Sequence, residues 1–133
     1  MARSARGLLA LALLAVAGAA EAAAPRTTRD RIYSAAQADR GKQVYQAVCV
    51  QCHALEFYRG EAMKSWSGGS LADLYDALSV KMPQSNPGSL KRRQYLDILA
   101  YILALNGMPA GEQELPAAAA ELKAIRIKWG SKP

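Results

Sequence analysis

The sequence predicts an all-α domain. Apolar residues recur at helical spacing in three stretches, and helix-start or helix-stop residues border each stretch. No series of strand-like segments separates them, and the chain contains no internal repeat. The expected helices cover residues 35–48, 71–80 and about 90–105, so we expect a fold of three or more short helices.

The first helix is expected to begin directly after Ser34. In the segment Ser34-Ala-Ala-Gln37, the serine hydroxyl and the glutamine amide can both satisfy backbone N–H groups that the first turn leaves free, as in a capping box. One face of this helix carries four residues at helical spacing, namely Gly41, Val44, Tyr45 and Val48. Because glycine has no side chain, we expect a second helix to approach closely at Gly41.

The second helix has a similar start signal. Ser70, followed three positions later by Asp73, predicts a helix over residues 71–80. Its inner side should carry the four residues at helical spacing, Leu71, Leu74, Tyr75 and Leu78. The preceding residues, 54–69, contain glycines and have no sustained period, so they are expected to form a loop.

The third helix is the most apolar of the three. Ser89 is expected to cap it, and Asn106-Gly107 is a left-handed stop signal at its end. Apolar residues extend around much of its circumference, which predicts burial on more than one side. The loop before it contains Pro83 and Pro87, so regular structure is not expected there.

Residues 1–22 have the layout of a cleaved secretory signal peptide. Arg3 and Arg6 precede an apolar run and a small-residue cleavage pattern. The run is shorter than the roughly 20 residues of a membrane-spanning helix, so we expect export to the periplasm and peripheral or no membrane contact afterwards. Residues 23–33 then form an extended lead-in, residues 34–109 the helical domain, and residues 110–133 a C-terminal tail of unknown role.

The charge balance favours a protein partner. Loss of Arg3, Arg6 and Glu21 with the leader reduces the 17 basic and 11 acidic side chains to 15 and 10, a net of about +5. The basic residues are scattered and lack the aromatic interleaving of a nucleic-acid binder, so no nucleic-acid partner is expected. A mildly basic face suits an acidic protein partner. The alternative is that these charges are simply solvated and bind no partner.

The two cysteines of the chain form the motif Cys49-Val50-Gln51-Cys52-His53, which is typical of covalent haem attachment. Two thiols at this spacing can form thioethers with the vinyl groups on one side of a haem, and the next residue then directs its imidazole at the iron. His53 is the only histidine of the sequence, so a zinc site lacks a fourth Cys or His ligand. A thioredoxin-like dithiol would open a helix after a strand, whereas this pair closes a helix.

A methionine is the expected sixth ligand of the iron, and Met82 is the preferred candidate. It lies 29 residues beyond His53, after a full helix that can carry the chain to the opposite haem face, and Pro83 stiffens its loop. Met63 lies too close to His53 in sequence, and Met108 lies past the last helix stop. A bound haem would also supply an apolar body for five leucines of the helices, without which the fold should be marginal: Leu74, Leu78, Leu96, Leu99 and Leu103.

These features together resemble a class I c-type cytochrome. The resemblance rests on Gly41-x-x-x-Tyr45, the Cys-x-x-Cys-His motif, the Met82-Pro83 loop and the Leu99-Ala-Tyr101-Ile helix. It implies a cytochrome c fold around one covalently bound haem, in which Gly41 and Tyr45 pack against Tyr101. Two further aromatic residues resemble hydrogen-bond donors to the haem propionates: Trp66 and Tyr75.

The implied function is electron transfer without catalysis. The segment after Met82 is similar to small periplasmic cytochromes that serve quinoprotein alcohol dehydrogenases. We therefore expect a monohaem carrier that passes electrons from a dehydrogenase towards a terminal oxidase or another cytochrome. Two alternatives remain open: a haem sensor or peroxidase-like enzyme with an open iron site, and a cytochrome subunit fixed in a membrane dehydrogenase complex.

Overall fold

The computed structural model describes residues 25–129, which contain five α-helices, two further helical turns and no β-strand. The predicted all-α fold is therefore confirmed, whereas the predicted leader lies outside the described residues. The α-helices are α1 (Ala35–Val44), α2 (Glu61–Lys64), α3 (Leu71–Lys81), α4 (Arg92–Leu105) and α5 (Ala119–Ala124). A π-helical turn, η1 (Tyr45–Cys49), continues α1, and a 3-10 turn, η2 (Leu55–Tyr58), precedes α2. No helix in the described part of the chain is long and apolar enough to cross a membrane.

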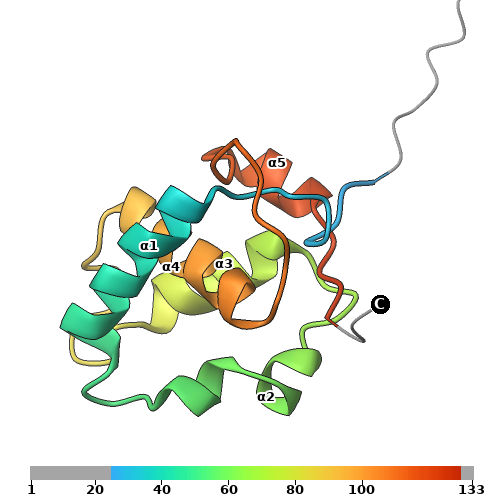
Figure 1. The fold of residues 1–133 in the computed structure, drawn as a ribbon. Coiled ribbons are helices and arrows are strands. Elements are labelled where there is room, and N and C mark those ends of the chain that lie inside the picture. Colours follow the sequence, from blue (N-terminus) through green and yellow to red (C-terminus); the bar gives the residue numbers. More distant parts are fainter. Residues whose placement is uncertain (1–24, 130–133) are drawn as a thin grey trace, which may run out of the picture.

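Helices α1 and α4 pack closely against each other (Figure 1). At Gly41 a Cβ atom would lie 1.8 Å from the carbonyl oxygen of Asp97 on α4, so only glycine fits this crossing. One turn further on, the rings of Tyr45 and Tyr101 lie 5.6 Å apart. The close approach at Gly41 and the pairing of Tyr45 with Tyr101 are therefore confirmed.

Helix α3 follows its sequence signals in detail. The Ser70 hydroxyl accepts a hydrogen bond from the Asp73 N–H at 3.2 Å, and the Asp73 carboxylate accepts one from the Ser70 N–H at 2.8 Å. The four residues expected on the inner side are all buried: Leu71, Leu74, Tyr75 and Leu78. The start of α3 and its buried face are therefore confirmed.

The starts of α1 and α4 differ from the prediction. The Ser34 hydroxyl caps α1, but the Gln37 side chain accepts a hydrogen bond from the distant Leu115 N–H at 2.9 Å rather than completing a capping box. For α4 the prediction of a Ser89 cap is wrong, because the helix begins three residues later, at Arg92. There the Lys91 N–H donates to the Gln94 side chain at 2.9 Å.

Helix α4 ends as the sequence predicts. Gly107 has φ +72°, and the adjacent Met108 N–H donates to the Leu103 carbonyl at 3.1 Å, so the predicted left-handed stop is confirmed.

Residues 54–69, the segment before α3, are not only a loop, because they contain η2 and α2. Gly60, with φ +58°, separates these two turns, and each is too short to produce a periodic signal.

The predicted tail packs on the rest of the domain. Four of its apolar side chains are at most 4% exposed: Leu115, Leu122, Ile125 and Ile127. Helix α5 lies against α3 (Figure 1). The Ile127 N–H donates to the Gly69 carbonyl at 2.9 Å, and the Arg126 N–H donates to the Arg26 carbonyl at 2.8 Å. The C-terminal segment thus joins the lead-in to the turn that starts α3.

Candidate cofactor site

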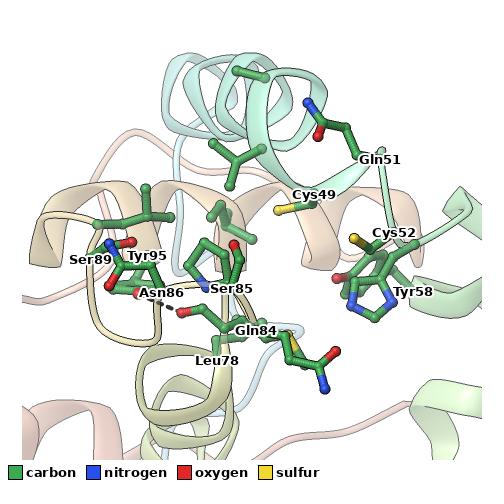
Figure 2. A pocket seen from close by; sticks show the side chains of 17 residues that line it. Cys49, Gln51, Cys52, Tyr58, Leu78, Gln84, Ser85, Asn86, Ser89 and Tyr95 are labelled. Carbon is green, nitrogen blue, oxygen red and sulfur yellow. Dashed lines mark hydrogen bonds between the residues drawn. The ribbon is translucent and has the colours of Figure 1, made fainter.

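A cavity of about 650 Å³ lies between the end of the α1–η1 helix, the loop after α3 and the first half of α4 (Figure 2). This volume falls within the range of about 300–1,000 Å³ that is usual for small-molecule and cofactor sites. Its apolar lining comes from several elements and includes Ala47, Val48, Leu78, Leu90 and Ile98. The cavity is therefore large enough, and apolar enough, for an organic cofactor.

Four of the six predicted site residues line this cavity: Cys49, Cys52, His53 and Met82. The two thiols lie on one side, across from the loop that carries Gln84, Ser85 and Asn86 (Figure 2). The chain turns tightly within the motif, because the N–H groups of Cys52 and His53 both donate to the Cys49 carbonyl, at 3.2 and 3.0 Å. The fold thus gathers a dithiol, an imidazole and a thioether around one space.

The chemistry of the two cysteines differs from that of a redox dithiol. Both are free thiols, and burial raises the pKa of the Cys49 thiol. Thioredoxin-like pairs need the opposite shift, since their nucleophilic cysteine works as a thiolate at neutral pH. The burial of Cys49 therefore argues against a dithiol–disulfide function for this motif.

The backbone and the ring of His53 are both held by aromatic residues. Its imidazole stacks on Phe57, with ring centroids 4.8 Å apart, and meets the edge of Tyr58 at 5.8 Å. Its carbonyl accepts a hydrogen bond from the Tyr45 hydroxyl at 2.8 Å. Burial, and to a lesser extent Tyr101, raises the pKa of the Tyr45 phenol, so this group remains a protonated donor at neutral pH.

Met82 occupies the point where α3 ends and the chain becomes extended, with φ −126° and ψ 149°. Its N–H donates to the Leu78 carbonyl at 2.9 Å, and its own carbonyl accepts from the Tyr95 hydroxyl at 2.7 Å. The other two methionines among the described residues, Met63 and Met108, are buried but do not line the cavity. The geometry thus favours Met82 over both alternatives.

The two predicted propionate donors are not among the cavity-lining residues. Tyr75 packs against Tyr95, with ring centroids 6.1 Å apart, and lies under the Arg92 guanidinium at 4.6 Å. Trp66 is partly buried against the apolar core. Their role towards a cofactor stays a prediction from the resemblance.

The sequence-based interpretation missed two tyrosines of the site, Tyr58 and Tyr95. A signal for Tyr95 was present, because it lies on the buried side of an otherwise apolar helix, where its hydroxyl needs a hydrogen-bond partner. The prediction that five leucines pack against the cofactor also needs correction. Only Leu78 of the five leucines lines the cavity, and the others are buried in the core beside it: Leu74, Leu96, Leu99 and Leu103.

Comparison with known proteins agrees with this site. Residues 36–125 match a family model and identify the domain as a c-type cytochrome, whose activity is haem-based electron transfer. The family is described as cytochrome c oxidase, cbb3-type, subunit III, and the chain belongs to it. No curated protein and no solved structure matches the chain. The cavity fits the haem c that such a domain carries, because it is apolar and presents two thiols beside an imidazole.

Proposed function

We propose that this protein is a periplasmic, monohaem carrier of single electrons, with Cys49 and Cys52 as the covalent attachment points and His53 and Met82 as the iron ligands. The observation that carries the proposal is the convergence of these four side chains on one cavity of about 650 Å³. His53 is the only histidine of the sequence, so the imidazole ligand has no competitor within the chain.

Each of the four residues has a distinct task. Cys49 and Cys52 would anchor the cofactor to the end of the first helix, and His53 and Met82 would ligate the iron. When bound, a haem c supplies a one-electron couple, and thioether ligation shifts that couple to higher potential. Because His53 and Met82 would both be bound to the iron, no free position would remain on it for a substrate. The protein is therefore proposed to be a carrier rather than an enzyme.

The proposed partners are redox proteins, a dehydrogenase as donor and an oxidase or another cytochrome as acceptor. Lysines Lys42, Lys81 and Lys91 are exposed, whereas Lys64 forms an ion pair with Glu61. Two exposed apolar side chains are close in sequence to the proposed site: Val50 lies within the attachment motif, and Val80 precedes Lys81. Exposed lysines together with exposed apolar side chains suit a transient complex with an acidic protein.

Covalent attachment tests the proposal directly. The haem, the pigment of the protein, should stay on the polypeptide through denaturation and acid–acetone extraction. Voltammetry should show one reversible one-electron couple. The double variant Cys49→Ala/Cys52→Ala should lose the retained pigment, while Met63→Ala, buried outside the cavity, should keep it. Pigment that is extracted from the unmodified protein, or a second couple, contradicts the proposal.

The family description favours a second candidate, a cytochrome subunit fixed in a membrane oxidase complex. Cell fractionation separates the two candidates. A free carrier leaves the cell with the periplasmic fraction, and a fixed subunit remains with the membranes and co-migrates with the complex on a native gel.

A further inference from the structure

We infer that Tyr45 and Tyr95 are positioning residues, each of which holds one of the two iron ligands through a hydrogen bond to that ligand's backbone carbonyl. The inference rests on the proposed function, because it takes His53 and Met82 as the ligands. The two tyrosines come from different helices, yet each donates to the peptide of one ligand residue: Tyr45 to His53 at 2.8 Å and Tyr95 to Met82 at 2.7 Å.

Tyr45 acts on the His53 side. Its side chain is buried, and its ring is wedged between Tyr58, at 5.8 Å and perpendicular, and Tyr101, at 5.6 Å. Its hydroxyl therefore has a fixed position, and the bond to His53 spans the whole attachment motif from the start of η1. This hydrogen bond fixes the peptide group that follows the His53 Cα, and it thereby restricts the orientation of the imidazole.

Tyr95 acts on the Met82 side. It is buried on α4 and lines the cavity itself, and its bond to Met82 is shown dashed in Figure 2. The Gly88 N–H approaches the same carbonyl only at 3.4 Å, so the phenol is the shorter contact. Since the Met82 N–H is bound to Leu78, both peptide groups of the proposed ligand are held.

Loss of either hydroxyl should affect ligation as well as folding. Both hydrogen bonds are part-buried, and the one from the phenol is the shorter of the two that the Met82 carbonyl accepts. The loss of such a bond costs on the order of 1.4 kcal/mol, which corresponds to about tenfold in an equilibrium between bound and released ligand. A tyrosine-to-phenylalanine change keeps the ring and its packing, so the effect reports on the hydrogen bond alone.

The chain provides a matched control in Tyr33. This tyrosine is also buried, and its hydroxyl donates to a methionine carbonyl, that of Met108, at 2.6 Å. Met108 does not line the cavity. Tyr33→Phe therefore removes a bond of the same kind without touching a proposed ligand, and it measures the purely structural cost.

The test compares the three phenylalanine variants as full-length, haem-loaded proteins. For Tyr95→Phe we expect the affinity of the ferric protein for cyanide to rise about tenfold, because Met82 is displaced more easily. For Tyr45→Phe we expect the hyperfine-shifted NMR signals of the His53 ring to move while cyanide affinity stays near that of the unmodified protein. For Tyr33→Phe we expect a lower unfolding temperature with neither change.

Equal cyanide affinities in Tyr95→Phe and Tyr33→Phe overturn the role of Tyr95, and unmoved ring signals in Tyr45→Phe overturn the role of Tyr45. Met82→Ala keeps these outcomes distinct from failure of the proposed function. If Met82→Ala raises cyanide affinity and Tyr95→Phe does not, the ligand assignment stands and the positioning role fails. If Met82→Ala leaves cyanide affinity unchanged, the ligand assignment itself fails.

Discussion

At the scale of single residues, the sequence predicts candidate ligands but not the hydrogen bonds that hold them. The spacing of Met82 from His53, together with Pro83 after it, predicts Met82 as a ligand, and the fold places both residues at one cavity. The hydrogen bonds to their carbonyls were not predictable, because the partners lie 8 and 13 residues away and depend on how helices pack. The same holds for Gln37, whose partner Leu115 is 78 residues distant.

Arg40 forms ion pairs with two carboxylates, those of Asp97 and Glu114. Its guanidinium binds both carboxylate oxygens of Asp97, at 3.1 and 2.9 Å, and reaches Glu114 at 2.7 Å. The Asp97 side chain is only 5% exposed. The hydrogen bonds that the guanidinium donates to Asp97 first, and then to Glu114, raise the pKa of Arg40, so this side chain stays charged throughout the usual pH range.

We predict that Arg40→Ala lowers the free energy of unfolding by about 2 kcal/mol, since it leaves a buried carboxylate without its bidentate partner while Arg40 itself is partly solvated. Arg93→Ala is the matched control, because Arg93 is exposed and meets Glu114 only at 3.5 Å. Denaturant unfolding at constant ionic strength measures both values. Equal losses in the two variants contradict the prediction.

At the scale of the helices, prediction succeeded where the signals were adjacent in the sequence. Helix α3 was predicted closely because Ser70 and Asp73 cap it within one turn. Helix α4 starts later than predicted, because the irregular loop continues past Ser89, whose N–H still bonds back to Asn86 at 3.3 Å. The short turns η2 and α2 were missed because neither has the length that periodicity requires.

The cap of α3 predicts a pH dependence of stability. The backbone N–H of Ser70 first, and then its hydroxyl, lowers the pKa of the Asp73 carboxyl below its ordinary value of 3.8. The folded state therefore favours the charged carboxylate, which stabilises the protein above the ordinary pKa and loses this effect as pH falls through the lowered one. We expect the stability difference between the unmodified protein and Asp73→Asn to shrink below about pH 4. Urea unfolding from pH 7 to pH 3 measures it, and a constant difference contradicts it.

The whole molecule has a larger protein core than the sequence suggested. Residues 110–133 are predicted to form a tail, because their alanine-rich stretch has weak local signals. In their described part, residues 110–129, the contacts are with distant segments. Leu122, Ile125 and Ile127 are nevertheless fully buried or nearly so, in the same core as Leu99 and Leu103. The helices therefore pack on one another as well as around the cavity.

The net positive charge of the whole chain predicts salt-sensitive association with a redox partner. With the predicted leader removed, a net of about +5 would attract an acidic protein over a screened range of roughly 10 Å at 0.1 M ionic strength. We expect the second-order rate of electron transfer to fall steadily as salt is raised, measured by stopped-flow. Lys81→Gln should flatten the dependence more than Lys64→Gln, since Lys64 is already paired with Glu61. A flat or rising profile in the unmodified protein points instead to a tight, mainly apolar complex.

The proposed ligation of iron by His53 and Met82 is the central claim, and one substitution series tests it most directly. Met82→Ala should abolish the weak sulfur-to-iron charge-transfer band of the oxidised protein, lower its reduction potential and allow cyanide or carbon monoxide to bind. Met63→Ala and Met108→Ala should keep the band, because neither residue lines the cavity. A band that survives Met82→Ala and disappears in one of the other two variants contradicts the assignment, and an unmodified protein that readily binds carbon monoxide contradicts the carrier function.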